Sequence, residues 1–214
     1  MEKKKIVVAI PAMNTVPTQF AASLAVLQKP EDAVIGFQMG SLAFTARNNL
    51  AKAAVDMGAD YVFWLDSDMT FEPDTLMRLL ALAEERPDAI ISGLYFRRVA
   101  PYTPVVYDVL DIADKDATYR IVADIPDEIF EVAAVGFGCC LTPASALKAV
   151  MDEFGAPFNH IRGVGEDLSF CWRARQCGVK IYCDPSISCG HVGYMVFTRA
   201  FYDRQFSTQT KEGT

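Results

Sequence analysis

Apolar runs alternate with amphipathic stretches along the first half of the chain. Runs rich in β-branched and aromatic residues, typical of buried strands, cover residues 6–10, 33–39, 61–65 and 89–95. Apolar residues recur at helical spacing between them, over residues 17–28, 42–57 and 74–86. This alternation predicts a mostly parallel α/β sheet with helices on both faces.

The second half has a different pattern. Residues 97–130 contain scattered prolines and two short strand patterns near 105–109 and 119–122, which predict a small antiparallel insertion. Arg97 and Arg98 begin this insertion and either meet a phosphate or an acidic acceptor or lie solvated at the surface. A strand is predicted over 131–141, where two glycines flank Phe137 and indicate a close approach of backbone to a ligand or partner. Helices are predicted over 143–155 and 166–178.

Two carboxylates end the apolar run 61–65. Asp66 and Asp68 fall at the carboxyl end of this predicted strand, where α/β sheets place their ligand sites. Because an unpaired buried carboxylate is costly, we expect a divalent cation, Mg²⁺ or Mn²⁺, that holds a phosphate. The alternative is an acidic turn in which one aspartate caps the following helix.

Arg47 belongs to the buried face of the helix predicted over 42–57. It lies three residues before Leu50 and seven before Ala54, near the helix start. A buried arginine needs an anion, which is either a nucleotide or carboxylate in the cleft or a salt bridge to Asp66 or another core acid.

A second acidic pair, Glu166 and Asp167, opens the helix predicted over 166–178. Asp167 lies four residues before Cys171, so it faces the cleft, where it acts as a general base or caps the helix. His191, in a glycine-flanked turn, is either a metal ligand that favours Mn²⁺ or a structural residue. His160 is expected beside Glu166, where it could contact an acceptor.

Composition narrows the classes of function. The 214 residues are 51% hydrophobic and 22% charged, which predicts one globular domain. A net charge of −7 argues against bulk binding of nucleic acid, and no segment approaches the roughly 20 apolar residues of a membrane span. The six cysteines form no CxxC pair, so we expect reduced thiols in a cytoplasmic protein, with a Cys183–Cys189 bridge as the alternative.

Six short motifs together carry a family resemblance. They are, in order, Ile-Pro-Ala-Met-Asn14, Ala-Arg-Asn48, Trp-Leu-Asp-Ser-Asp68, Gly-Phe-Gly138, Gly-Glu-Asp167 and Gly-His191. In this order the chain resembles GT-A glycosyltransferases of the family 2 type, from about residue 5 to residue 193. The resemblance implies a Rossmann-like GT-A fold and one catalytic domain over residues 1–206. Its halves, 1–96 and 97–206, would bind the nucleotide-sugar and the acceptor, and residues 207–214 would be a flexible tail.

The resemblance also implies a donor and a set of site residues. The donor is a nucleotide-diphosphate sugar, a UDP- or GDP-sugar, bound with Mn²⁺ or Mg²⁺. The residues implied around the nucleotide are Pro11, Ala12, Met13, Arg47, Asp66 and Ser67. The stretch 33–39 has no acid where many relatives bind uracil, which leaves the nucleotide open.

The chemistry implied by the resemblance is transfer of the sugar to a glycan or another hydroxyl acceptor. Asp66 to Asp68 corresponds to the DxD motif, in which Asp68 binds the metal and Asp66 contacts the ribose or a metal-bound water. His191 is the further metal ligand. Asp167, paired with Glu166, is the base of inverting members, although retaining members share these features.

Two other functions compete. Asp66-Ser-Asp68-Met-Thr70 also fits the opening motif of haloacid-dehalogenase phosphotransferases, with Asp66 as nucleophile. A non-catalytic nucleotide-sugar-binding module is the second alternative. We also expect a lid or a homo-oligomer contact from late aromatic residues, namely Tyr194, Phe197, Phe201, Tyr202 and Phe206.

Overall fold

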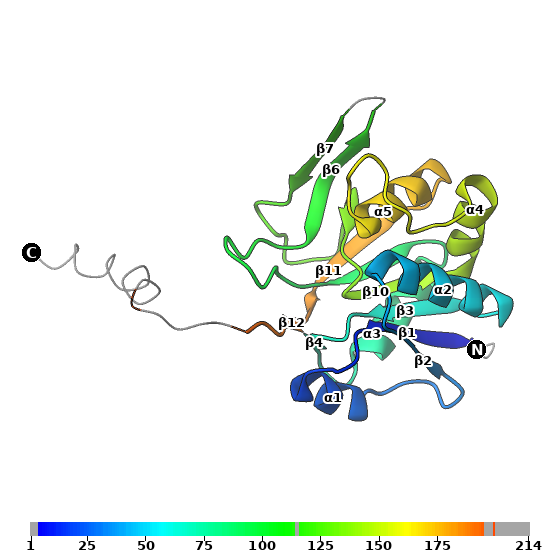
Figure 1. The fold of residues 1–214 in the computed structure, drawn as a ribbon, viewed down its shortest axis with the longest axis vertical. Coiled ribbons are helices and arrows are strands. Elements are labelled where there is room, and N and C mark those ends of the chain that lie inside the picture. The colour runs from blue at the N-terminus through cyan, green and yellow to red at the C-terminus, as the bar shows by residue number, and fades with distance from the viewer. Residues whose placement is uncertain (1–3, 114–115, 195–198, 200–214) are drawn as a thin grey trace, which may run out of the picture.

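The computed structural model describes residues 4–113, 116–194 and 199. Its strands and helices alternate through the first half, and the hairpin of β6 and β7 projects from the rest of the fold (Figure 1). The helices of the described part are α1 (Thr18–Ala25), α2 (Ala43–Asp56), α3 (Thr75–Glu85), α4 (Ala144–Phe154) and α5 (Glu166–Gln176). The predicted tail over 207–214 lies outside the described residues, as do the aromatic residues predicted after Tyr194.

A central sheet organises the chain. Its strands are, in spatial order, β2 (Val34–Met39), β1 (Ile6–Ala12), β3 (Tyr61–Leu65), β10 (Cys139–Pro143), β5 (Ile90–Leu94), β11 (Ile181–Ser188) and β8 (Phe130–Glu131). Strands β1, β2, β3, β5 and β11 run in one direction, and β10 and β8 run against them. The predicted mostly parallel α/β sheet is confirmed.

Two smaller sheets complete the described part. Strands β6 (Val106–Ile112), β7 (Ala117–Ile121) and β9 (Ala134–Val135) form an antiparallel sheet, which confirms the predicted insertion. Strands β4 (Met69–Thr70) and β12 (Gly190–His191) pair beside the central sheet. This short ladder brings the segment after Asp68 against the segment that carries His191.

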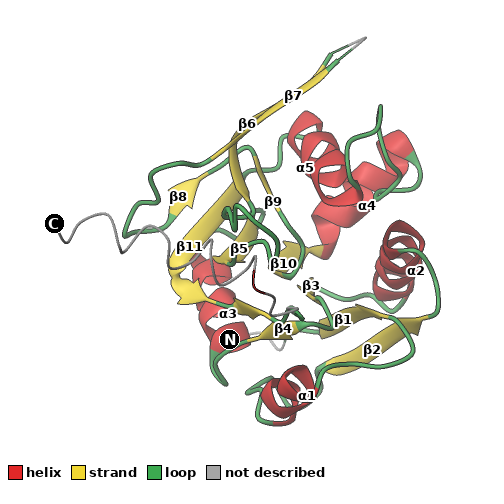
Figure 2. Ribbon diagram, turned by 60° about the vertical axis from the view of Figure 1, so that its left-hand side comes forward, coloured by secondary structure: helices red, strands yellow, loops and turns green. Residues whose placement is uncertain are grey.

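Helices cover both faces of the central sheet (Figure 2). Apolar residues of α2, α4 and α5 pack in one core cluster, and those of α1 and α3 pack in another. Strand β3 contributes side chains to both core clusters. Trp64 belongs to the first cluster, whereas Phe63 and Leu65 belong to the second. Every residue of β3 is buried, as its unbroken apolar run predicts.

The single strand predicted over 131–141 is wrong. The chain there forms the end of β8, then β9, then the start of β10, and each pairs with a different neighbour. Strand β10 inserts antiparallel between β3 and β5. An apolar run shows that a segment is buried but not which strand it pairs with, so the breaks were invisible in the sequence.

Gly136 and Gly138 make room for the ring of Tyr95. A Cβ atom on Gly136 would lie 1.9 Å from Tyr95 Oη, and one on Gly138 would lie 2.9 Å from Tyr95 Cζ. The amide of Gly138 donates a hydrogen bond to the same hydroxyl, at 3.1 Å. The close approach predicted from the two glycines is therefore to a buried tyrosine of the same chain.

This packing gives a first testable expectation. Gly136→Ala should lower the free energy of unfolding by about 2–3 kcal/mol, because the new methyl group overlaps Tyr95 and the core cannot shift easily. Tyr95→Phe removes the nearest clashing atom, so the double variant should regain part of the loss. Urea denaturation of both variants measures this. Gly165→Ala, where the added Cβ meets no atom within 4 Å and φ is −58°, is the control for general glycine effects, and an equal loss there would contradict the clash.

The cysteines, the start of α3 and the lengths of the helices can be compared with the predictions from the sequence. All six cysteines are free, so the expected reduced thiols are confirmed and the Cys183–Cys189 bridge is wrong. Asp74 is the residue before α3, and its side chain makes no capping hydrogen bond. Among the described helices, none combines the length and the apolar character needed to cross a membrane.

Candidate active site

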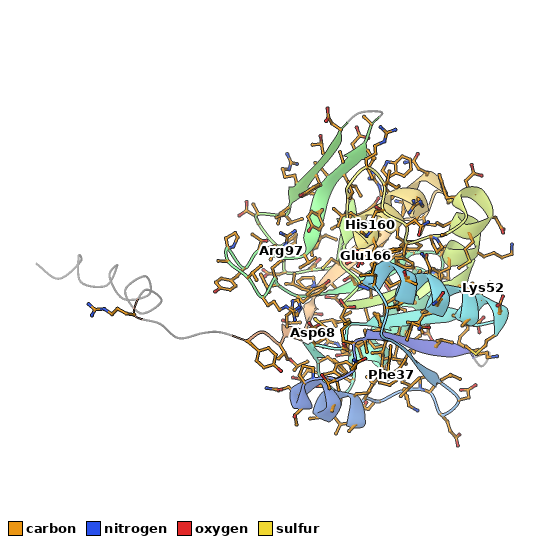
Figure 3. The ribbon with its side chains drawn as sticks, in the orientation of Figure 1. Phe37, Lys52, Asp68, Arg97, His160 and Glu166 are labelled. Atoms are coloured by element: carbon orange, nitrogen blue, oxygen red, sulfur yellow. The ribbon has the colours of Figure 1, made fainter. Side chains whose placement is uncertain are left out.

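A cleft of about 310 Å³ opens where β1 and β3 end. The start of α2 and the first turn of α5 form its other walls. Every residue that the sequence predicts for the site lines it, namely Pro11, Ala12, Met13, Arg47, Asp66, Ser67, Asp68, Glu166, Asp167 and His191. Figure 3 places Asp68, Glu166 and His160 in this part of the molecule, away from Lys52 on α2. Residues more than a hundred positions apart thus meet at one edge of the sheet.

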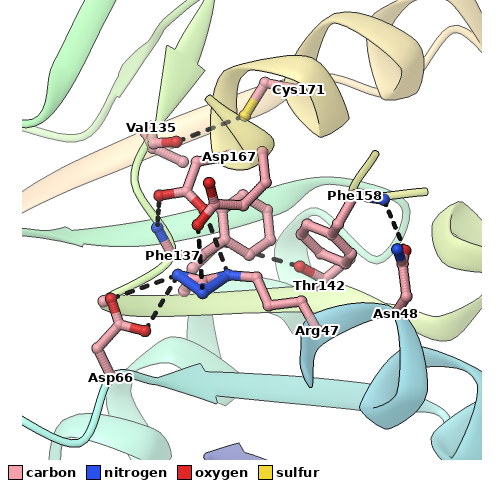
Figure 4. Close-up of polar contacts among 12 residues, drawn as sticks. Arg47, Asn48, Asp66, Val135, Phe137, Thr142, Phe158, Asp167 and Cys171 are labelled. Atoms are coloured by element: carbon pink, nitrogen blue, oxygen red, sulfur yellow. Dashed lines mark hydrogen bonds and ion pairs between the residues drawn. The ribbon is translucent and has the colours of Figure 1, made fainter. Parts of the chain in front are cut away.

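Arg47 joins the two acidic pairs from the buried side of the cleft. Its side chain is 3% exposed, with Nη2 3.0 Å from Asp66 Oδ1 and Nε 3.2 Å from Asp167 Oδ1 (Figure 4). Glu166 Oε1 lies further away, 4.0 Å from Nη1. The predicted salt bridge to Asp66 is confirmed, and Asp167 is its second partner.

Burial sets the charges in this cluster. Burial alone would lower the pKa of Arg47, but the charges of Asp167, Asp66 and Glu166 outweigh it and raise that pKa. Burial raises the pKa of Asp167 to about 7, although Arg47 opposes the change. Burial also raises the pKa of Asp66, again against Arg47. One guanidinium therefore faces more carboxylate charge than it neutralises.

Asp167 points away from its own helix. Its Oδ2 accepts a hydrogen bond from the Phe137 amide at 3.2 Å, and Gly165, the residue before α5, provides no side-chain cap. Asp167 also lies in the first turn of α5, where the helix dipole favours a negative charge, so the choice between general base and helix cap stays a prediction. The cap alternative for Asp66 and Asp68 is wrong, because α3 begins after Asp74.

Asp68 and His191 face each other across the short ladder of β4 and β12. His191 Nε2 lies 3.5 Å from Asp68 Oδ1, and Nδ1 lies 2.9 Å from the carbonyl oxygen of Phe96. Because the Phe96 carbonyl can only accept a hydrogen bond, Nδ1 of His191 carries a proton. The other ring nitrogen, Nε2, faces the Asp68 carboxylate. Contact with Asp68 raises the pKa of His191; for Asp68, partial burial is outweighed by His191 and Arg98, which lower its pKa.

This pair fits a divalent metal ion. A carboxylate oxygen and an imidazole nitrogen suit Mn²⁺, and a metal-binding histidine commonly donates its other N–H to a backbone carbonyl. Within the part of the chain that the structure describes, no group of three or more His, Cys, Asp or Glu side chains is arranged to hold a metal. Asp66 binds Arg47, so its role as a metal ligand stays a prediction.

Arg98 supplies an unexpected partner for Asp68. Its Nη1 forms an ion pair with Asp68 Oδ2 and donates to the Val192 carbonyl at 3.3 Å. None of the three expectations for Arg98, which were a phosphate, an acidic acceptor and a solvated surface position, named an acid of the site itself. Only the folding of the segment after β5 against β12 brings the two together.

Three further residues of the site were not predicted. The Ser41 hydroxyl, which lines the cleft, is buried and has no hydrogen-bond partner among the described residues. Tyr95 packs its ring 5.8 Å from that of His191. Asn48 binds the Phe158 amide at 2.9 Å and so ties α2 to the loop before α5. A polar residue next to Arg47 was the only sequence signal for Asn48.

The loop that leads to α5 is held in place by side chains. Arg173 donates to the carbonyl oxygens of Pro157 and Asn159, at 2.8 and 2.6 Å. His160 Nε2 lies 3.5 Å from Glu166 Oε2, as expected from the sequence. The loop before Glu166 and Asp167 is therefore held against α5 by Arg173 and by the contact between His160 and Glu166.

The central sheet, its flanking helices and the smaller antiparallel sheet have the arrangement of the GT-A fold. Residues 40–131 match the family described as Glycosyl transferase family 2. None of the curated proteins compared with the sequence matches it. The family match covers less than half of the chain, and it agrees with the GT-A fold of the described residues.

Solved structures agree on the fold. A197 from STIV superposes with a TM-score of 0.63 at 17% identity, over 90% of this chain and 87% of that one. GalNAc-T7, solved with UDP, GalNAc and Mn²⁺, also gives 0.63, at 10% identity, over 98% of this chain. This chain spans 51% of the GalNAc-T7 chain. At these identities the likeness concerns the fold.

Proposed function

We propose that the protein transfers a sugar from a nucleotide-diphosphate sugar to a hydroxyl acceptor, in a reaction that needs a divalent cation and inverts the anomeric carbon. The observation that carries this is the meeting of the Asp68–His191 pair and the half-buried Asp167 in one cleft. The first can hold a metal and the second can accept a proton. The predicted division into a donor half and an acceptor half belongs to the same proposal.

The charge in the cleft favours a cation. Four carboxylates, those of Asp66, Asp68, Glu166 and Asp167, line it together with the two guanidinium groups of Arg47 and Arg98. A diphosphate would be repelled by this excess of negative charge unless a divalent ion entered with it. GalNAc-T7, the structural neighbour of the same fold, was solved with UDP and Mn²⁺, which supports the same pairing here.

The donor would lie along the ends of β1 and β3. Pro11 to Met13 and Ser67 line the cleft there, and the unpartnered Ser41 hydroxyl offers a hydrogen bond to a ribose or phosphate oxygen. Asp68 and His191 would hold the cation, which neutralises charge on the leaving diphosphate when it is bound.

Asp167 would take the proton from the acceptor hydroxyl as that oxygen attacks the anomeric carbon. A pKa of about 7 suits this role, because such a carboxylate is a stronger base than an ordinary aspartate and is deprotonated in about half of the molecules at pH 7 and in most of them at pH 8. The Phe137 amide and Arg47 hold the carboxylate in one orientation. His160, beside Glu166, would contact the acceptor.

The competing functions have less support. A phosphotransferase would need Asp66 as nucleophile, but both of its oxygens accept from Arg47 Nη2, at 3.0 and 3.3 Å, which reduces their nucleophilicity. A non-catalytic binding module would have no need for a half-buried carboxylate with a raised pKa, such as that of Asp167. The six free cysteines support a reducing compartment, and we propose the cytoplasm.

Calorimetry with UDP-, GDP- and dTDP-sugars, with and without Mn²⁺, tests the proposed function. We expect one donor to bind with Mn²⁺ and to bind at least tenfold more weakly without it. Asp68→Asn should remove this dependence on metal, because a neutral amide is a poor ligand for a divalent cation. Asp152→Asn, at an exposed ion pair on α4, is the matched control. Equal binding with and without Mn²⁺ would contradict the proposal.

A further inference from the structure

We propose that Arg98 is an exchangeable cation of the active site. In the absence of ligand it occupies Asp68, and when a divalent ion and a diphosphate bind together it leaves Asp68 and pairs with the phosphates. This inference rests on the proposed function and adds to it an order of events. Metal and nucleotide would bind cooperatively because each favours the same displacement of Arg98.

Asp68 has no free carboxylate oxygen in the structure. Arg98 Nη1 pairs with Oδ2, and His191 Nε2 lies 3.5 Å from Oδ1. A metal ion that takes Asp68 and His191 as ligands must therefore compete with a guanidinium already on the same carboxylate. Two cations at one carboxylate repel each other, so one of them has to move.

Arg98 is free to move in a way that Arg47 is not. The side chain of Arg98 is 49% exposed and that of Arg47 is 3% exposed. Arg47 pairs with three carboxylates. The guanidinium of Arg98 donates to Asp68 and to the Val192 carbonyl among the described residues. An ion pair at such a half-exposed side chain is weak, so little free energy is lost when it exchanges.

Space for the movement is present on the other side of Arg98. The residue lines the active-site cleft and also a neighbouring cavity of about 360 Å³, which Phe96, Tyr102 and Gly193 help to line. Gly193 packs closely on the first part of the side chain, because a Cβ there would lie 3.0 Å from Arg98 Cβ. The first carbons of the Arg98 side chain are thus held by Gly193, while the residue lines both cavities.

A diphosphate is the natural new partner for this guanidinium. Planar guanidinium groups pair with phosphate oxygens through two hydrogen bonds, which a single carboxylate oxygen does not offer. The metal would take over the charge of Asp68 at the same time. Because coupling between two ligands is reciprocal, the nucleotide should then raise the affinity for metal and the metal should raise the affinity for nucleotide.

Two titrations of Arg98→Gln test the inference without measuring catalysis. Free Mn²⁺, followed by electron paramagnetic resonance, should bind the variant roughly threefold to fivefold more tightly than it binds the wild type, because the competing cation is gone. UDP or GDP, titrated by calorimetry at saturating Mn²⁺, should bind roughly tenfold more weakly, because the phosphates lose a charged donor. Arg120→Gln, in an exposed ion pair with Asp108, is the control and should change neither affinity.

Tighter binding of Mn²⁺ together with weaker binding of the nucleotide by Arg98→Gln distinguishes an exchangeable cation from a structural residue. If Arg98 only supports the local structure, its replacement should weaken both ligands, and that result would overturn the inference. Unchanged affinities would overturn it as well, while leaving the proposed function intact as long as the wild type binds Mn²⁺ and nucleotide. A wild type that binds neither would remove both the inference and the proposed function.

Discussion

Asp167→Asn is expected to lower the rate of sugar transfer by roughly a hundredfold to ten-thousandfold while donor binding is retained. The amide has the shape of the carboxylate and can still accept the Phe137 N–H, but it cannot take a proton from the acceptor. Transfer measured with the donor found by calorimetry, together with donor affinity for the same variant, separates the two effects. A variant that transfers at the wild-type rate would show that Asp167 is not the base.

The pH dependence of the wild type adds an independent check on this assignment. Protonated Asp167 cannot act as a base, so the rate at saturating donor should rise as the pH increases through about 7 and then level off. The residual activity of Asp167→Asn should lack this step. Asp152→Asn, at the surface of α4, should keep the wild-type profile. The same step in Asp167→Asn would assign it to another group.

Arg47→Met is expected to lower the free energy of unfolding by about 3–5 kcal/mol at pH 8, because it leaves the half-buried carboxylates of Asp66 and Asp167 without a countercharge. Methionine has nearly the same length, so little packing is lost and the effect is mainly electrostatic. Chemical denaturation followed by fluorescence measures it, and the midpoint should fall with little change in slope.

The loss should depend on pH in a defined direction. Without Arg47, both carboxyl groups should have pKa values above those of the unfolded chain, so the folded state binds more protons and is stabilised as the pH falls. The difference between variant and wild type should therefore be smaller at pH 5.5 than at pH 8. Arg120→Met, at the exposed pair with Asp108, should have little effect at either pH. A loss that does not change with pH would indicate a packing defect instead.

The first half of the fold was predictable because its signals are local. Each strand there is a short apolar run and each helix has a buried stripe, so β3 and α2 follow from a few adjacent residues. The second half was predicted less well. Strand β11 was not predicted, and β8, β9 and β10 were joined into one strand, because their separation depends on partners far away in the chain.

The sequence by itself predicted which residues lie together in the candidate active site. Acids that end a buried strand or open a helix must lie at an edge of the sheet, so Asp66, Asp68 and Asp167 could be grouped before any coordinates. The resemblance to a family then joined His191 to them. The structure brings all four into one cleft, and their roles remain those of the proposed function.

Only the tertiary structure decided how these residues are paired. Arg47 binds Asp66 and Asp167, Arg98 covers Asp68, and the two glycines around Phe137 face Tyr95 and not a ligand. Such contacts join segments whose distance in space is set by strand order and by the crossing of loops, which no local pattern records. Strand β10 runs antiparallel to β3 and β5. Its position places the preceding residue Phe137, whose amide donates to Asp167, beside the cleft.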